Sequence, residues 1–344
     1  MLSVIIPVLD EAESLPQLVR ELNAVAAAHG YDLQTIIIDD GSKDGTWATI
    51  NQLSAADPRI LGIRLRRNFG KAAALSAGFH AADGDRIVTI DGDLQDNPAE
   101  IANLLAKLDD GYDVVSGWKR ERFDPWHKVL PSRVFNWLVS WLMGVHLHDH
   151  NCGLKAYRRE VMHEIRLYGE LHRFAPVLAA AKGFRVGEVV VAHRPRKFGK
   201  SKYGVSRLTK GLLDLLTVKF IVGYGQRPQH MLGTVGLLAF LLGGLGMVYL
   251  AVVWVLTRTV SGWTPVNLHE TAALFYCLGL FIIGAQFLSV GLLGEMIAAH
   301  WVRDTDTYSI AEHTSPVAGG PVARSTEPGA GSQASLAAPH SDTK

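Results

Sequence analysis

The sequence predicts an α/β protein with a mostly parallel, Rossmann-like sheet and helices on both faces, followed by a membrane-associated C-terminal part. Short apolar runs rich in β-branched residues alternate with stretches whose apolar residues recur at helical spacing. Because parallel strands need helical crossovers, this alternation favours a layered α/β domain. Two later stretches are apolar and uncharged over more than the roughly 20 residues that cross a bilayer.

The N-terminal part contains five expected strands, each a short apolar run, over 3–8, 33–38, 60–65, 86–90 and 114–117. Helices are expected between them, over 15–28, 47–56, 72–82 and 99–108. Ser14 precedes the first helix as a start signal, and Pro98 lies near the start of the fourth. Since no Gly-x-Gly-x-x-Gly motif opens the first helix, a dinucleotide site of the dehydrogenase type is poorly supported.

Acidic residues follow three of these strands, in the pairs Asp10/Glu11, Asp39/Asp40 and Asp91/Asp93. Because the carboxyl ends of parallel strands meet at one edge of a sheet, we expect a binding site there. The third pair belongs to the stretch DGDLQD at 91–96, in which Asp93 and Gln95 offer hard oxygen ligands. Such ligands suit Mg²⁺ or Mn²⁺ better than Zn²⁺, and a cation there would neutralise a diphosphate.

A tryptophan-rich segment over 126–147 carries apolar residues at helical spacing, with Lys128 and Arg133 between them. Two interpretations stay open: an amphipathic helix that faces the core, or a helix that lies in the membrane interface. Three alternating histidines follow, at 146, 148 and 150. Because a clear fourth ligand is missing, a polar loop is favoured over a metal site.

A dense basic loop with glycines covers 194–204. Cations on a flexible backbone suit the phosphate groups of a ligand, and attraction to anionic lipid headgroups is the alternative. The loop closes an expected N-terminal domain over 1–204 and leads into an amphipathic juxtamembrane helix over 205–228.

Two transmembrane helices are expected within 229–300, at about 231–257 and 271–294. The approach to the first is basic, through Lys219 and Arg227, so its start is expected in the cytoplasm. A hairpin then returns the tail, over 301–344, to the cytoplasm. The tail is rich in Gly, Ala, Ser and Pro, which predicts that it is largely disordered.

The overall composition narrows the choice of compartment and partners. The formal net charge is +1, which gives no reason to expect a nucleic-acid partner. Cys152 and Cys277 suggest neither a disulfide framework nor a zinc site, so a reducing compartment fits. No signal peptide is predicted before the first strand. We therefore expect a multi-pass protein of the inner (plasma) membrane whose N-terminal domain is cytoplasmic.

Six motifs occur in one order along the chain: VIIPVLDEAESL at 4–15, IIIDDGSKDGT at 36–46, RNFGKAAALSAGF at 67–79, DGDLQDNP at 91–98, CGLKAYRREV at 152–161 and FGKSKYG at 198–204. In this combination the sequence resembles the family 2 glycosyltransferases of GT-A fold, specifically the polyprenyl-phosphate glycosyltransferases related to dolichyl-phosphate mannose synthase. The two-span C-terminal part resembles the bacterial members.

The resemblance implies roles for individual residues, which fall into groups by ligand. The nucleotide would be contacted by Pro7, Glu11 and Asp40, with Asp91 and Gly92 beside it. Asp93 and Gln95 would hold the divalent cation and diphosphate, and Arg196 and Lys202 would lie near the phosphates. Asp149 is our candidate for a carboxylate that orients the sugar or acceptor. The acceptor phosphate is assigned to three arginines, Arg120, Arg122 and Arg133.

Two departures from the family leave the donor open. Leu9-Asp10 stands where the family commonly has Tyr-Asn, which removes an aromatic side chain near the base. The CGLK stretch at 152–155 also differs from that of the relatives best known for mannose. A UDP-sugar is favoured as donor, and GDP-mannose is the alternative.

The expected reaction is an inverting transfer of one sugar to a polyprenyl phosphate, such as undecaprenyl phosphate, at the cytoplasmic membrane face. A non-catalytic, membrane-tethered protein that binds sugar nucleotides is a weaker alternative, because a structural role does not need an intact Asp-x-Asp. A processive polysaccharide synthase is disfavoured by the two spans and the lack of a Gln-x-x-Arg-Trp motif. A homo-oligomer is left open.

Overall fold

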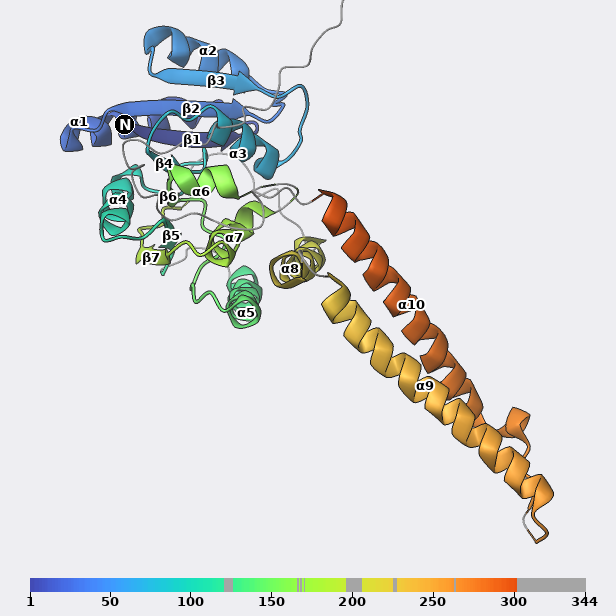
Figure 1. Ribbon diagram of the computed structural model, residues 1–344. Coiled ribbons are helices and arrows are strands. Elements are labelled where there is room, and N and C mark those ends of the chain that lie inside the picture. The colour runs from blue at the N-terminus through green and yellow to red at the C-terminus, as the bar shows by residue number, and fades with distance from the viewer. Residues whose placement is uncertain are drawn as a thin grey trace, which may run out of the picture. The chain divides into compact units, whose positions relative to one another are not determined.

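A seven-stranded sheet organises the N-terminal part of the protein (Figure 1). The structure, a computed structural model, describes residues 1–120, 126–165, 167, 169, 171–195, 206–224, 228–262 and 264–301. The strands lie in the order β3-β2-β1-β4-β6-β5-β7. Their bounds are β1 Leu2–Val8, β2 Leu33–Asp39, β3 Ile60–Arg64, β4 Arg86–Thr89, β5 Val114–Trp118, β6 Lys155–Arg158 and β7 Val186–Val190.

Most neighbouring strands run parallel, as the sequence predicts. β1 pairs with β2 and β4, β2 with β3, and β5 with β7, all in parallel. β6 is the exception, because it runs antiparallel to both β4 and β5. The five expected strands are all present, whereas β6 and β7 lie outside the expected set.

Helices cover both faces of the sheet, with bounds α1 Leu15–His29, α2 Thr46–Ala56, α3 Lys71–His80, α4 Ile101–Asp109, α6 Arg159–Glu164 and α7 Ala175–Ala181. The pleat of β1 explains this arrangement, since successive side chains of a strand point to opposite faces. Val4 and Ile6 belong to the core formed with α1 and α4, whereas Ile5 belongs to the core formed with α3. A short 3₁₀ turn, η1 at Pro98–Glu100, precedes α4 where the sequence predicts a helix start.

One face of the tryptophan-rich segment packs in the core, whereas its placement in the membrane interface stays a prediction. The segment forms α5, Trp126–Met143, and one of its faces packs through Val139 against Phe174 of the 3₁₀ turn η2, Leu171–Phe174. Helix α8, Ser206–Tyr224, joins the same core cluster. Trp137 and Trp141 lie on the other face of α5, stacked on each other and 65% and 68% exposed. One face of α5 therefore serves the core and the other remains open.

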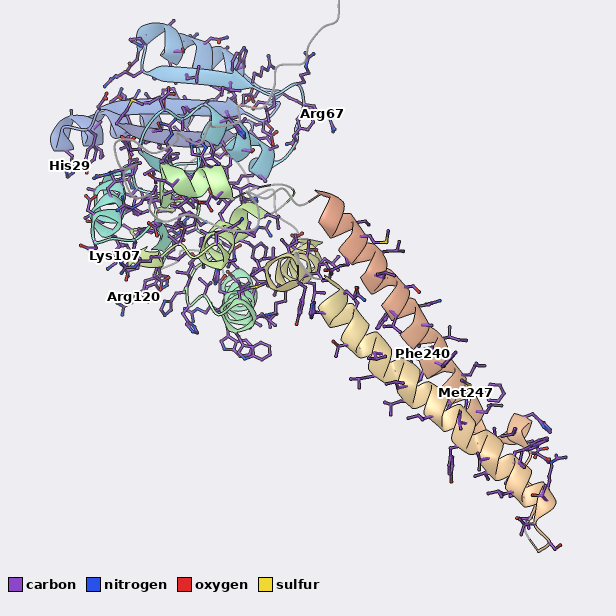
Figure 2. All side chains as sticks on the ribbon, in the orientation of Figure 1. His29, Arg67, Lys107, Arg120, Phe240 and Met247 are labelled. Atoms are coloured by element: carbon purple, nitrogen blue, oxygen red, sulfur yellow. The ribbon has the colours of Figure 1, made fainter. Side chains whose placement is uncertain are left out.

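Helices α9, Pro228–Thr259, and α10, Ala272–Trp301, run side by side as a hairpin, with η3, Leu268–Glu270, near its turn (Figure 1). Both are long and apolar enough to cross a membrane. Glycines allow the close approach, because a Cβ on Gly243 would lie 2.6 Å from the carbonyl oxygen of Cys277. The side chain of Phe240, labelled with Met247 in Figure 2, stacks on Phe281 at a centroid distance of 4.3 Å. Most other apolar side chains of the hairpin are exposed, unlike those of a soluble core.

Candidate active site

The loops that follow β1 and β2 are joined by side-chain hydrogen bonds. The backbone N–H of Asp10 donates to Oγ of Ser42 at 2.9 Å, and the N–H of Lys43 donates back to Oδ1 of Asp10 at 2.9 Å. The N–H of Glu11 donates to Oγ1 of Thr46, also at 2.9 Å. Asp10 takes a left-handed backbone conformation with φ 55° to enter this arrangement. The first acidic pair therefore shapes the edge where a ligand would bind.

The second acidic pair holds the chain segment that begins α3. Oδ1 of Asp40 accepts from the N–H of Phe69 at 2.8 Å, and Oδ2 accepts from the N–H of Gly70 at 3.0 Å. Burial raises the pKa of Asp40, and these two hydrogen bonds partly offset the effect. Gly41, with φ 76°, is required there, since a Cβ would lie 2.6 Å from the backbone nitrogen of Asn68. Asp40 thus positions the start of α3, and its expected contact with the nucleotide stays a prediction.

The DGDLQD turn follows β4 and lies close against the end of β1. A Cβ on Gly92 would lie 2.7 Å from Cγ1 of Val8, so a larger residue does not fit. Leu94 adopts a left-handed conformation with φ 61° although its side chain is buried in the core. Oδ1 of Asp93 accepts from the N–H of Gln95 at 3.2 Å. The turn is therefore held in one conformation with Asp93 partly exposed.

A buried ion pair anchors the far end of this turn. Asp96 is 1% exposed, and its Oδ1 lies 2.6 Å from Nζ of Lys119, just beyond β5. Burial alone would lower the pKa of Lys119, but the Asp96 carboxylate raises it above its ordinary value. An isolated β-bridge also joins Asp96 to His193. Both contacts tie the DGDLQD turn to the β5–β7 side of the sheet.

Three lysines converge on the carboxylate of Asp91. Lys71, the first residue of α3, forms an ion pair with it, and Lys119 and Lys155 act on it through their charges. Burial opposes the ionisation of Asp91, yet these charges, led by Lys71, lower its pKa to about 2. We call Lys71, Lys119 and Lys155 the lysine cluster. It gathers positive charge from α3, from the residue that follows β5 and from β6, beside the DGDLQD turn.

The segment that enters β6 packs beneath Asp91. A Cβ on Gly153 would lie 2.7 Å from Oδ1 of Asp91, which requires glycine there. Lys155 is 4% exposed and donates to the carbonyl oxygen of Cys152. Burial lowers the pKa of Lys155, and the charges of Asp149 and Asp91 are among those that oppose this. Asp149 is also buried and accepts at Oδ1 from the N–H of Asn151 at 3.0 Å. Its role toward sugar or acceptor stays a prediction.

A basic pair in η2 lies within electrostatic range of the lysine cluster. Arg173 is buried, and burial followed by the charges of Lys71 and Arg173 lowers the pKa of His172 to about 2. His172 is therefore neutral at physiological pH. The lysine cluster and this pair are absent from the residues expected from sequence. The six family motifs could have indicated two of the lysines, because Lys71 lies in the motif at 67–79 and Lys155 in the motif at 152–161.

The alternating histidines have structural partners. His150 is fully buried, and its Nε2 lies 3.0 Å from Oγ of Ser140. His148 stacks on Trp118 at a centroid distance of 4.0 Å and pairs with Glu188. Across the described ranges, no group of three or more His, Cys, Asp or Glu side chains could hold a metal ion. The loop therefore shows no metal site among these residues.

Three of the remaining expected residues are described by the structure, and three lie outside the described residues. Pro7 lies in β1, half-buried and paired with Ile38 of β2. Arg120 and Arg133 are exposed on the surface. Three others, Arg122, Arg196 and Lys202, fall outside the residues that the structure describes.

The start of the basic loop is nevertheless placed. The N–H of Arg194 donates to the carbonyl oxygen of Gln95 at 2.9 Å, and its guanidinium binds Glu21 and Asn97 at 2.7 Å each. The first residue of the basic loop is therefore hydrogen-bonded to the DGDLQD turn.

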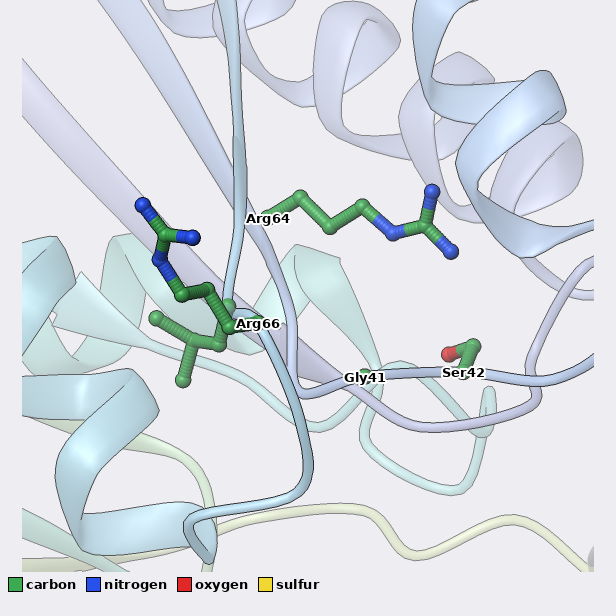
Figure 3. Close-up of a pocket in the computed structure, with 5 residues that line it drawn as sticks. Gly41, Ser42, Arg64 and Arg66 are labelled. Atoms are coloured by element: carbon green, nitrogen blue, oxygen red, sulfur yellow. The ribbon is translucent and has the colours of Figure 1, made fainter.

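A hollow of about 460 Å³ lies at the carboxyl ends of β2 and β3 (Figure 3). It is lined by Gly41, Ser42, Arg64, Leu65 and Arg66. In the close-up the side chains of Arg64 and Arg66 extend from the β3 side, and Ser42 lies on the opposite loop. Nε of Arg64 lies 3.3 Å from the buried carboxylate of Asp39. The hollow is thus open, basic and close to the second acidic pair.

Comparison with known proteins decides the family. The model of "Glycosyl transferase family 2" matches residues 3–166. The chain is 35% identical over 308 residues to the dodecaprenyl-phosphate galacturonate synthase of Rhizobium johnstonii, covering 88% of this chain and 89% of that protein. The chain belongs to glycosyl transferase family 2. As a glycosyltransferase, it has the enzyme class that the six motifs imply.

Two solved structures are similar to this glycosyltransferase over 64% of its chain. One is described as the crystal structure of a mycobacterial protein, with 21% identity, a TM-score of 0.48 and 74% of that chain covered. The other is glucosyl-3-phosphoglycerate synthase from Mycobacterium tuberculosis in complex with Mn²⁺ and uridine-diphosphate-glucose, with 19% identity, a TM-score of 0.48 and 78% covered.

Proposed function

We propose that this glycosyltransferase moves one sugar from a nucleotide-diphosphate donor to a polyprenyl phosphate at the cytoplasmic membrane face, with the help of Mg²⁺ or Mn²⁺. The convergence of the lysine cluster on Asp91 carries the proposal, because it concentrates positive charge where a diphosphate would bind. The name of the Rhizobium relative supports a polyprenyl phosphate as acceptor. A UDP-sugar is the favoured donor, and the same name makes a hexuronate the first sugar to test.

The sheet edge offers separate places for the two ends of such a donor. The hollow lies at β2 and β3, whereas the DGDLQD turn follows β4, with β1 between β2 and β4. Neighbouring strands lie about 4.8 Å apart, so β2 and β4 are roughly 10 Å apart. A nucleoside near the hollow would direct its diphosphate towards Asp91 and Asp93. The volume of the hollow falls in the range common for small-molecule sites.

Asp93 and Gln95 would hold a divalent cation, and the diphosphate of the nucleotide sugar would supply further oxygen ligands. The lysine cluster already balances the charge of Asp91, which leaves Asp93 to supply the carboxylate. Mg²⁺ is commonly held by one or two carboxylates together with substrate phosphates and water. A bound cation would neutralise charge on the departing diphosphate. One carboxylate and one amide oxygen suit a cation that the protein shares with its substrate better than a cation held by protein ligands alone.

The chemistry needs placement and positive charge more than a base. A phosphate monoester has a second pKa near 6, so the acceptor arrives ionised at pH 7. One of its oxygens would attack the anomeric carbon while the bond from that carbon to the nucleoside diphosphate breaks, which inverts the anomeric centre. No proton has to be removed. Lys71, the most exposed of the three lysines, would stabilise the charge that develops on the leaving diphosphate.

A lipid acceptor agrees with the exposed apolar surfaces near the soluble part. Trp137 and Trp141 of α5, and Leu213 and Leu216 of α8, are all more than half exposed. Tryptophan and leucine on one face are typical of helices that lie in the membrane interface. We propose that these two helices dock on the bilayer, which would bring the polyprenyl phosphate to the sheet edge.

The experiment that tests the function is a donor panel on the full chain in detergent or nanodiscs. Labelled UDP-hexuronates, UDP-hexoses, UDP-N-acetylhexosamines and GDP-mannose are each supplied with undecaprenyl phosphate. Transfer from a UDP-sugar into a lipid monophosphate product is expected, with undecaprenol as the control acceptor that lacks the phosphate. Transfer only from GDP-mannose would refute the donor assignment, and no product from any donor would refute the reaction.

The proposed topology places the catalytic domain and the tail in the cytoplasm and residues 261–267 outside. Ser261→Cys and Gly320→Cys are compared with a membrane-impermeant maleimide on intact cells. Cys152 is buried and Cys277 lies within the second span, so the background signal is expected to be low. Labelling at position 261 alone is expected, and labelling at position 320 alone would reverse the hairpin.

A further inference from the structure

Helix α10 carries two seams on opposite sides, and α9 covers only one of them. The covered seam consists of residues at alternating spacings of four and three, Cys277, Phe281, Gly284, Leu288 and Gly291, whose backbone or side chains approach glycines or neighbouring residues of α9. Such spacing, which averages 3.5 residues, is what one helix presents to another in a left-handed pair. We call these five residues the inner seam, and their spacing is the one that a contact between helices has in this protein.

The opposite side of α10 repeats the same spacing. It carries Phe275, Gly279, Ile282, Gln286, Ser289, Leu293 and Met296, again at alternating intervals of four and three. All but Gly279 are exposed, and a Cβ on Gly279 would meet nothing within 4 Å. A groove of about 360 Å³ runs along this side, and Ile282, Gln286 and Ser289 help to line it. We call these seven residues the outer seam.

Gln286 gives the outer seam its polar centre. It lies near the middle of the span Ala272–Ile297, and its amide makes no hydrogen bond to any described residue. Water is absent at that depth, so an amide facing lipid would lose its hydrogen bonds. Ser289, one turn away, already donates to the carbonyl oxygen of Ala285 at 2.9 Å. A hydrogen-bonding partner for the amide of Gln286 would therefore have to come from another helix.

We propose that the outer seam binds the outer seam of a second copy of this chain, with Gln286 hydrogen-bonded to the Gln286 of that copy. An amide both donates and accepts, so two identical residues across a twofold axis satisfy each other. Gly279 and Ser289 are small, which lets two helix backbones approach closely. The proposal rests on the membrane placement of the hairpin given above and is independent of donor and acceptor.

Photo-crosslinking in membranes tests the contact directly. The full chain carries p-benzoylphenylalanine at position 289 or, as the matched control, at position 245, where Leu245 is 67% exposed near the middle of α9. Irradiation is expected to give a covalent product of twice the chain mass from position 289 only. Adducts to lipid or to a different protein, or equal dimer from both positions, would overturn the proposal.

Fluorescence energy transfer between labelled chains in liposomes measures the strength of the contact. Gln286→Leu is expected to weaken dimerisation about three- to tenfold, in line with hydrogen bonds between transmembrane helices. Gln286→Asn keeps a self-complementary amide and should retain more of the dimer than Gln286→Leu. Carbonate extraction and thermal melts confirm that each variant is membrane-integrated and folded. An unchanged dimer in Gln286→Leu contradicts the proposal, whatever the outcome of the donor panel.

Discussion

The ammonium group of Lys71, at the start of α3, forms an ion pair with the carboxylate of Asp91, at the end of β4. The two residues are 20 positions apart in the chain, and Asp40 brings them together by binding the backbone of Phe69 and Gly70. This contact links the second acidic pair of the sheet edge to the DGDLQD turn. It also leaves the ammonium group of Lys71 on a partly exposed side chain beside the proposed diphosphate site.

The first prediction concerns that lysine. Lys71→Ala is expected to lower turnover about 100-fold, because one cation that faces the leaving diphosphate is lost. Lys71→Arg should lose less, since it keeps the charge. Steady-state rates with a saturating acceptor measure both. Lys107→Ala, which removes a lysine on α4 paired with Asp110, is the control and should remain active. Equal rates for Lys71→Ala and Lys107→Ala would exclude a role for Lys71.

The second prediction concerns the cation. Asp93→Ala should abolish most turnover and leave the thermal midpoint within a few degrees, because Asp93 lies in a partly exposed turn. Wild-type activity should fall with EDTA and return with Mg²⁺ or Mn²⁺. Asp109→Ala, which removes a surface carboxylate that pairs with Arg86, is the control. Full activity of Asp93→Ala in EDTA would show that the metal assignment is wrong.

The third prediction concerns the pH dependence of stability through His150. Burial, and then the charge of Lys155, lowers its pKa from the ordinary 6.5 to about 4, while Asp149 opposes the shift. The unfolded chain takes up this proton below pH 6.5 and the folded protein only near pH 4, so stability is lost as pH falls between these values. At pH 5 the loss is about 2 kcal/mol relative to pH 7.

The measurement is the change in thermal midpoint between pH 7 and pH 5, in the wild type and in His150→Gln. Glutamine keeps a polar group for Ser140 and does not titrate, so the variant should lose several degrees less than the wild type. His80→Gln, at the exposed end of α3, is the control. Identical shifts in wild type and His150→Gln would contradict the assignment.

The fourth prediction concerns α5. If Trp137 and Trp141 insert into the interface, brominated phospholipids should quench part of the tryptophan fluorescence of the full chain in vesicles. The double variant Trp137→Ala/Trp141→Ala should lose much of that quenching. Trp47→Phe serves as the control, since Trp47 packs in the soluble part beside Arg64. Unchanged quenching in the double variant would show that α5 does not reach the bilayer.

The fifth prediction concerns the basic loop. Arg196→Ala and Lys202→Ala should lower turnover in neutral detergent, where no anionic bilayer exists, if these side chains serve the ligand phosphates. Attraction to lipid headgroups would instead give a loss that appears only with anionic vesicles and grows smaller with added salt. Wild-type rates for both variants in neutral detergent would reject a direct role.

The sequence by itself determined the strands up to β5, the acidic edge and the two long apolar helices. Each of these depends on a local signal: a short apolar run, closed in three cases by acidic residues, or a long uncharged stretch. β6 and β7 lack such a signal, because β6 begins and ends with a basic residue, Lys155 and Arg158, and β7 is interrupted by Gly187 and Glu188. The antiparallel direction of β6 follows from its pairing with β4 and β5, which no local pattern encodes.

Tertiary structure alone decided which charged residues work together. In the sequence Asp40 and Asp91 look alike, as carboxylates after a strand. In the fold both oxygens of Asp40 accept backbone N–H groups, whereas the charges of Lys71, Lys119 and Lys155 act on Asp91. The same holds for Gln286, whose spacing is readable in the sequence but whose exposure is set by the side of α10 that α9 covers. Helical and strand periods arise from neighbours in the chain, whereas charge clusters and open faces arise from segments that only folding brings together.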